Sequence, residues 1–243
     1  VSGLLREHDR ERFEIYAYSY GGMPAEEHRK SLGGTVDAFI DIRNPSRQQM
    51  LDLIRSHELH IALDLNGYTR FGRSELFAYR LAPIQINYLG YPGTMGADFM
   101  DYIVADKVLV PAEYRDGCSE KVIYLPGAYQ PNDNTRIVPE TGTSRSDFGL
   151  PENGFVFCCF NNLYKISSAE FDIWMRLLKQ VEGSVLWLLA ANEPAEANLR
   201  KEAAARGVEE GRILFADRVS PAEHLARHKH ADLFLDTFNY NAH

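Results

Sequence analysis

Val185-Leu186-Trp187-Leu188-Leu189 is a run of five apolar residues that leaves neither side-chain face polar. A strand of this kind fits a parallel sheet that helices cover on both faces. The clearest helical pattern, residues 167–181, lies before the run. It opens with Ser167 and Glu170 at the spacing of a capping box. A second helical stretch, 194–206, follows the run, so strand and helix alternate here and predict an α/β unit with a parallel sheet.

The same alternation extends over the whole chain. Short β-rich runs predict strands at residues 13–20, 36–42, 59–65, 84–89, 102–105, 121–125, 154–161, 184–189, 212–216 and 233–237. A further helix is predicted at 46–56, with Ser46 as its N-cap. Residues 139–151 are rich in Pro, Gly, Ser and Thr and lack apolar periodicity, which indicates a linker. We therefore expect two Rossmann-like domains, 1–138 and 152–243.

Composition limits the classes of function. The 243 residues are 45% hydrophobic and 25% charged, which is typical of a globular protein. The net charge of -8 argues against nucleic-acid binding, which needs clustered cations. Cys118, Cys158 and Cys159 are expected to be free thiols in a reducing compartment. No apolar run approaches a membrane span and no signal peptide is visible, so we expect a cytoplasmic protein without a membrane partner.

Ligands of open α/β sheets bind beyond the carboxyl ends of the strands, so the residues after each predicted strand are the first candidates. Arg70 follows strand 59–65 and could face an anion, although a solvated arginine in a turn is an equal alternative. Gly90-Tyr91-Pro92-Gly93-Thr94 follows strand 84–89. Its glycines allow a ligand to approach the backbone closely, although it is neither a Walker loop nor a GxGxxG fingerprint.

In the second half, Lys165 stands just before the helix that opens at Ser167, where an ammonium and a helix N-terminus could bind phosphate together. His224 and His228 have the i, i+4 spacing of a metal pair, but no third ligand is evident. A basic, phosphate-facing edge of His224 and Arg227 is the more economical interpretation, and no metal is expected. The residues alone predict a two-domain α/β protein that binds a phosphorylated or nucleotide ligand.

Several strings, in this order, resemble the catalytic region of the O-linked N-acetylglucosamine transferase and Spindly family. They include Asn66-Gly67-Tyr68-Thr69, Ala82-Pro83-Ile84-Gln85, Leu89-Gly90-Tyr91-Pro92-Gly93-Thr94, Met100-Asp101-Tyr102-Ile103, Phe160-Asn161-Asn162-Leu163-Tyr164-Lys165-Ile166 and Leu235-Asp236-Thr237. The resemblance covers nearly the whole chain. It implies a GT-B-like fold of two Rossmann-like domains facing a cleft, the second of them truncated. It also implies metal-independent, inverting transfer of N-acetylglucosamine from UDP-N-acetylglucosamine to Ser and Thr hydroxyls of proteins, without a cofactor.

The resemblance assigns roles residue by residue. Lys165 would hold the diphosphate and stabilise the leaving group, and is the candidate catalytic residue. Donor-contacting positions are matched by Asn162 and Tyr164, uridine-side contacts by His224 and Arg227, and the base-reading backbone by Arg218 and Val219. The loop beside the sugar and diphosphate is matched by Gly90, Tyr91, Pro92, Gly93 and Thr94. Arg70 occupies a position that is usually basic, and His243 matches a His that precedes a Thr-Thr pair facing the diphosphate.

Parts of the family pattern fall outside these residues. The Asp and His proposed as catalytic groups would precede Val1, and the Thr-Thr pair would follow His243. Tetratricopeptide repeats, which present the protein acceptor, would also lie elsewhere. We therefore expect the isolated 243 residues to be inactive. Two alternatives remain at this point: a Spindly-type protein O-fucosyltransferase using GDP-fucose, and a non-catalytic nucleotide-binding or scaffold module.

Overall fold

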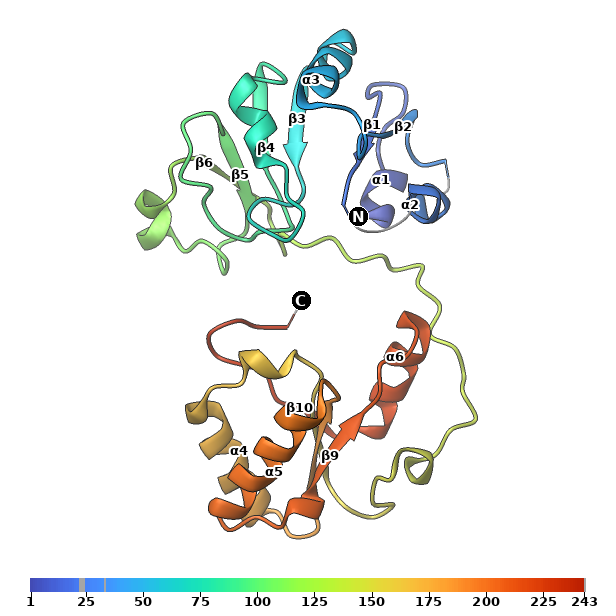
Figure 1. The fold of residues 1–243 in the computed structure, drawn as a ribbon, viewed down its shortest axis with the longest axis vertical. Helices are drawn as coiled ribbons and strands as arrows, with labels where there is room; N and C mark the ends of the chain where they lie inside the picture. Colours follow the sequence, from blue (N-terminus) through green and yellow to red (C-terminus); the bar gives the residue numbers. More distant parts are fainter. Residues whose placement is uncertain (22–24, 33, 243) are drawn as a thin grey trace. The chain divides into compact units, whose positions relative to one another are not determined.

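The computed structural model describes residues 1–21, 25–32 and 34–242. The chain divides into two compact units, Val1–Thr135 and Arg136–His243 (Figure 1). Every strand pairing within the described residues is parallel. In each sheet the carboxyl ends of the strands therefore lie along one edge, which is where ligands of such folds bind.

The second unit is built around β8 (Val185–Leu189), the apolar run that predicts the fold. The sheet has the order β10-β7-β8-β9. The other strands are β7 (Val156–Cys159), β9 (Ile213–Ala216) and β10 (Leu233–Phe234). The helices are α4 (Ser168–Gln180), α5 (Glu193–Ala205) and α6 (Pro221–Arg227), with 3-10 turns η3 (Arg145–Phe148), η4 (Leu163–Lys165), η5 (Glu210–Arg212) and η6 (His228–His230).

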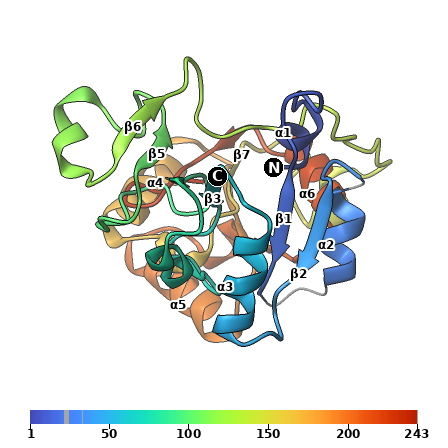
Figure 2. The same ribbon diagram turned by 90° about the horizontal axis from the view of Figure 1, so that it is seen from above.

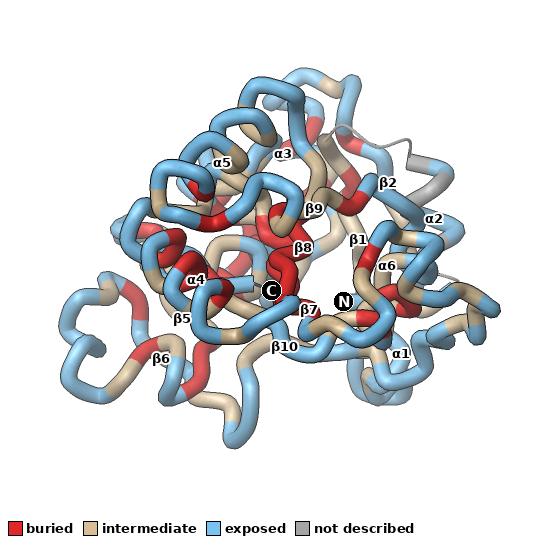
Figure 3. The backbone as a smooth tube through the Cα atoms, turned by 90° about the horizontal axis from the view of Figure 1, so that it is seen from below, coloured by how far each residue is buried: buried red, intermediate tan, exposed pale blue. Residues whose placement is uncertain are grey.

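Both faces of β8 are covered, as the sequence predicts. Leu186 and Leu188 pack with the apolar side of α4 on one face, and Trp187 packs with Phe148 and Phe160 on the other. Trp187 is fully buried. Figure 3 shows the backbone at β8 in the colour of buried residues. Truncating such a buried side chain typically lowers the free energy of unfolding by about 3–5 kcal/mol. The packing around Trp187 therefore helps to hold the strands, and with them their carboxyl ends, in place.

The first unit holds two sheets, with orders β1-β2 and β3-β4-β5-β6. Its strands are β1 (Tyr16–Ser19), β2 (Ala38–Asp41), β3 (Ile61–Asp64), β4 (Ile84–Asn87), β5 (Tyr102–Ala105) and β6 (Lys121–Tyr124). Its helices are α1 (Ser2–Arg6), α2 (Ala25–Leu32) and α3 (Arg47–Ser56), with 3-10 turns η1 (Ser74–Tyr79) and η2 (Ala112–Gly117). Figure 2 shows β1 and β2 side by side.

The strand β3 is less covered than β8. Ala62 and Asp64 are buried, whereas Ile61 and Leu63 are 43% and 47% exposed. The buried face packs in one core with Met50, Leu51 and Ile54 of α3. In the described residues this strand is therefore covered on one face only, which an apolar run in the sequence does not reveal.

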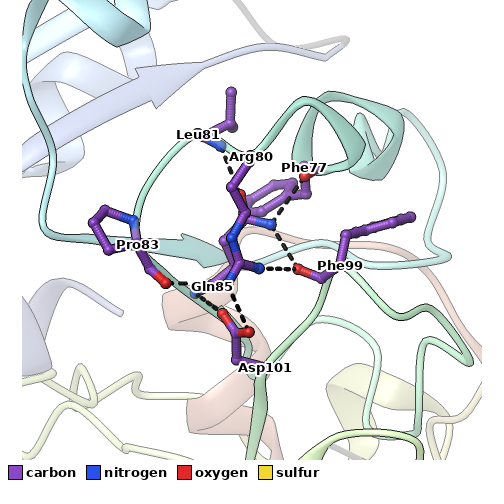
Figure 4. A network of polar contacts seen from close by, with 7 residues as sticks. All are labelled: Phe77, Arg80, Leu81, Pro83, Gln85, Phe99 and Asp101. Atoms are coloured by element: carbon purple, nitrogen blue, oxygen red, sulfur yellow. Dashed lines mark hydrogen bonds and ion pairs between the residues drawn. The ribbon is translucent and has the colours of Figure 1, made fainter.

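A polar network joins the beginning of β4 to the beginning of β5 (Figure 4). The Gln85 side chain is fully buried, donates to Phe77 O and Phe99 O, and accepts from Leu81 N. Asp101 accepts from Gln85 N and from the Arg80 guanidinium. These hydrogen bonds satisfy the buried side-chain amide of Gln85. A buried amide without hydrogen-bond partners would cost about 1–3 kcal/mol.

All ten predicted strands are present; β5 has the predicted bounds, and the other nine are shorter than predicted. The predicted caps of α3 and α4 are confirmed: Ser46 pairs with Gln49, and Ser167 with Glu170. The helices α1 and α2 are additions that the sequence did not predict. Residues of the predicted linker, 139–151, are part of the second unit: Arg145 forms a salt bridge with Asp232 and donates to His230 O and Gly154 O.

The three cysteines are free: Cys158 and Cys159 are buried, and Cys118 is half-buried. Burial raises the pKa of Cys158 to about 12 and that of Cys159 to about 11, so neither thiol is a nucleophile at neutral pH. Within the described part of the chain, no helix combines the length and the apolar character needed to cross a bilayer.

Candidate functional site

A cavity of about 760 Å³ lies at the carboxyl edge of the second unit's sheet. Phe160 and Asn161, which directly follow β7, line it together with Pro221, His224 and His228 from α6 and η6. Arg136, Ile137, Ala222, Leu225, Phe234 and Ala242 complete the lining. Apolar rings with a few polar groups are typical of a small-molecule site.

His224 holds a defined protonation state at this cavity. Arg227 Nη2 lies 2.6 Å from His224 Nδ1, and a guanidinium can only donate, so Nδ1 must be the acceptor. Burial lowers the pKa of His224 to about 4, helped by the charge of Arg227 and the neighbouring His228. The ring is therefore neutral at pH 7 and carries its proton on Nε2, which can donate to a ligand.

Arg227 is itself only 3% exposed and lies against aromatic rings. Its guanidinium carbon is 4.5 Å from the centroid of Phe160, and Nη1 donates to Asp217 O. Its Nε has no hydrogen-bond partner, and no ion pair to it is found among the described residues. The second unit thus places an unneutralised positive charge behind the cavity wall, which favours an electron-rich ligand.

His224 and His228, whose i, i+4 spacing is also found in metal sites, contact each other and their neighbours instead. His224 Nδ1 is engaged by Arg227, and His228 Nδ1 contacts His224 O at 2.7 Å. Over residues 1–21, 25–32 and 34–242 no group of three or more His, Cys, Asp or Glu side chains could hold a metal ion. The i, i+4 spacing therefore packs two rings edge to face, with centroids 4.7 Å apart.

Asn162, Tyr164 and Lys165 lie in the short segment of η4 between β7 and α4. Asn162 Oδ1 accepts from Arg218, and Asn162 Nδ2 lies 3.4 Å from Tyr164 Oη. Lys165 Nζ donates to Asn241 O at 3.2 Å, and Ala242, the next residue, lines the cavity. Val219 is exposed, next to Arg218 in the turn after β9. His243 lies outside the described residues.

The helix N-terminus contributes less than the sequence suggested. Glu170 is fully buried in the first turn of α4, where it accepts from Ser167 N and Phe238 N. Its carboxylate offsets the positive end of the helix dipole. The ammonium of Lys165, rather than the helix end, is therefore the group available to a phosphate.

In the first unit, the predicted loop 90–94 packs against the turn 66–72. Tyr68 Oη donates to Met95 O at 2.5 Å, and the rings of Tyr68 and Tyr91 meet with centroids 5.4 Å apart. Asn87 Nδ2 donates to Gly93 O, whereas Asn87 Oδ1 is buried without a hydrogen-bond partner. Arg70 is exposed, with its guanidinium over the Phe71 ring.

Buried Glu120 fixes the end of this loop. Its carboxylate accepts from Thr94 Oγ1 and Met95 N. The Thr94 hydroxyl in turn accepts from Gly96 N and Ser119 N. The Thr94 hydroxyl therefore helps to fix the shape of the loop.

Gly90 is required by a close backbone approach. A Cβ at this position would lie 2.1 Å from Leu65 O and 2.9 Å from Asn66 Cα. Because backbone atoms cannot yield easily, we expect Gly90→Ala to lower the free energy of unfolding of the first unit by about 1–3 kcal/mol. Gly127→Ala is the control, since nothing lies within 4 Å of its added carbon. Equal denaturation midpoints for the two variants would contradict the expectation.

Sequence reasoning missed several residues of the site. Phe160, Asn161, Pro221 and Ala242 line the cavity but were not candidates, and Glu120 shapes the first-unit loop from about 25 residues away. The position of Phe160 and Asn161 directly after a strand was an available signal. The partners of Glu120 come from a distant segment, and the sequence carries no signal for them.

Comparisons with known proteins agree with the motifs. The profile of Glycosyl transferase family 41 matches residues 2–142 and 135–243. The chain is 38% identical over 241 residues to a probable UDP-N-acetylglucosamine–peptide N-acetylglucosaminyltransferase SEC from Arabidopsis thaliana, covering 97% of this chain and 25% of that protein. It is 28% identical over 251 residues to a relative called SPINDLY from Eustoma exaltatum, covering 99% of this chain and 27% of the relative.

A solved structure has the same fold. A mutant O-GlcNAc transferase from Thermobaculum terrenum matches with a TM-score of 0.88 and 25% identity, over 99% of this chain and 45% of that one. The match confirms the predicted GT-B-like class of two α/β units with parallel sheets. The chain spans about a quarter of the curated relatives' length. Its sequence and fold together show that it belongs to glycosyl transferase family 41.

Proposed function

We propose that this chain forms the catalytic region of a protein O-N-acetylglucosaminyltransferase. The enzyme would move N-acetylglucosamine from UDP-N-acetylglucosamine to Ser or Thr hydroxyls, with inversion and without a metal or cofactor. The observation that carries the proposal is the contact of the Lys165 ammonium with Asn241 O, next to Ala242 in the lining of a cavity that the neutral His224 also lines, with buried Arg227 bonded to His224.

The chemistry assigns separate tasks to these residues. The acceptor hydroxyl forms a bond to the sugar C1 as the bond from C1 to the UDP oxygen breaks, so negative charge grows on the diphosphate. Lys165 would stabilise that charge as a hydrogen-bond donor. His224 Nε2–H would hold an acceptor atom of the nucleotide, and Arg227 fixes this tautomer. No residue described above is assigned as the base that deprotonates the acceptor.

The expected surroundings of the enzyme belong to the same proposal. The acceptor is a protein or peptide, presented by tetratricopeptide repeats outside these residues. The three free cysteines fit a reducing compartment, in keeping with the cytoplasm.

A calorimetric titration of the chain with UDP and with GDP tests the choice of donor. We expect UDP to bind about tenfold or more tightly than GDP, a difference of about 1.4 kcal/mol. The reverse order would favour the alternative, a protein O-fucosyltransferase that uses GDP-fucose. Failure of the full-length protein to transfer sugar to any acceptor peptide, with UDP still bound, would favour a non-catalytic module.

A further inference from the structure

The segment after β10, residues 236–242, is folded around one carboxylate. Asp236 Oδ1 accepts hydrogen bonds from Thr237 N at 2.8 Å, Ala242 N at 2.9 Å and Asn161 Nδ2 at 3.0 Å. Asp236 Oδ2 accepts a weaker bond from Asn241 Nδ2 at 3.3 Å. Burial alone would raise the pKa of Asp236, but these hydrogen bonds keep it below its ordinary value. The carboxylate therefore stays charged and joins the beginning of the segment to its end.

Two further contacts attach this segment to the rest of the unit. Thr237 is fully buried; its hydroxyl donates to Tyr240 O and accepts from Asn161 Nδ2. The carboxylate of Glu170 in α4 accepts from Phe238 N at 2.8 Å. These bonds hold the middle of the segment against β7 and α4, while Asp236 fixes its end.

The end of the segment contacts Lys165. Lys165 Nζ donates to Asn241 O and lies 4.9 Å from the centroid of the Tyr240 ring. Both partners fall inside the loop that Asp236 closes. No ion pair holds Lys165 in the described residues, so the carbonyl and the ring define where its ammonium stands.

We propose that Asp236 is a positioning residue for Lys165. By closing residues 236–242 into a compact loop, it presents Asn241 O and the Tyr240 ring to the ammonium. One donor of the ammonium is then bound, and the others remain for a diphosphate. The inference rests on the proposed function for the identity of that ligand, whereas the position of the side chain can be tested without any ligand.

The ligand-free test measures how fast an amine-reactive ester modifies Lys165, read by peptide mass spectrometry. In Asp236→Ala we expect the rate to rise about threefold or more relative to exposed Lys179 in the same molecules, because a freed ammonium samples more rotamers. Asp232→Ala is the matched control, because Asp232 holds the beginning of β10 by accepting hydrogen bonds from Arg145 and Val156 N. An unchanged Lys165 rate in Asp236→Ala would overturn the inference.

The ligand test compares UDP with uridine, which lacks phosphate. We expect Asp236→Ala to weaken UDP about tenfold and to change uridine by less than about twofold, as one misplaced charged donor should. Asp236→Asn keeps an oxygen for Thr237 N and Ala242 N, so UDP affinity should return to within about threefold of the original. An equal loss for UDP and uridine would mean a damaged cavity and would contradict the inference.

A double variant separates the inference from the proposed function. If Asp236 acts through Lys165, then Asp236→Ala should weaken UDP no further when Lys165→Ala is already present. A full additional loss in that background would overturn the positioning role. If Lys165→Ala alone leaves UDP affinity unchanged, the proposed phosphate contact fails, and the modification rate still decides whether Asp236 holds the side chain.

Discussion

Lys165→Ala is expected to lower the rate of sugar transfer by the full-length protein by at least an order of magnitude. Losing one preorganised donor to developing charge typically costs about 10²–10³ in turnover. In the described residues the Lys165 ammonium is held by neutral groups, the Asn241 carbonyl and the Tyr240 ring. Because no carboxylate in this described part of the chain neutralises it, its charge is available to the leaving diphosphate.

The measurement is UDP released from UDP-N-acetylglucosamine in the presence of an acceptor peptide. We expect kcat to fall more than KM rises, because the charge on the leaving group is larger in the transition state than in the bound donor. Lys179→Ala, in the last turn of α4, is the control. A turnover equal to that of the control would remove Lys165 from the mechanism.

The fold could be predicted because its strongest determinants are local. Five consecutive apolar residues at β8 demand cover on both faces, and Ser167 with Glu170 marks the start of α4. The helix α6 begins at a capping box of Ser220 and Glu223, a local signal in the sequence that the interpretation of its histidines did not use. The exposed face of β3 could not be predicted, because coverage depends on which elements reach it.

Several candidate residues could be named from their positions after strands, although Phe160 and Asn161, which also follow a strand, were missed. Lys165 and His224 stand at strand or helix ends, where position alone indicates a role. Asp236 and Asn161 are 75 positions apart in the sequence, and nothing in either local sequence indicates the pairing. The sequence also suggested a larger role for the N-terminus of α4 in binding phosphate. It indicates Glu170 as a capping residue but does not show that the carboxylate is buried there.

Arg227→Met is expected to change how binding responds to pH. In the unaltered chain the pKa of His224 is lowered to about 4, first by burial and then by Arg227. The unfolded chain, with an ordinary histidine pKa of about 6.5, binds more protons than the folded chain between these values. The stability contributed by neutral His224 is therefore fully present above about pH 6.5 and lost as pH falls towards 4.

Without Arg227, the pKa of His224 should rise, while burial still keeps it below the ordinary value. The donor that fixed Nδ1 as an acceptor is also lost, so Nε2–H is no longer the sole tautomer. We expect UDP affinity near pH 7 to fall about tenfold, comparable to losing a charge-assisted hydrogen bond. Protonation of the His224 ring on acidification should also begin at a higher pH than in the unaltered chain.

An NMR titration of the His224 ring, with UDP affinity measured across the same pH range, checks both expectations. Lys229→Met removes an exposed positive charge from the same edge of the unit, and Lys229 is not among the groups that shift His224. That variant should leave the pKa of His224 at about 4. If the pKa in Arg227→Met also stays there, burial alone sets the protonation state, and the guanidinium must act on the ligand directly.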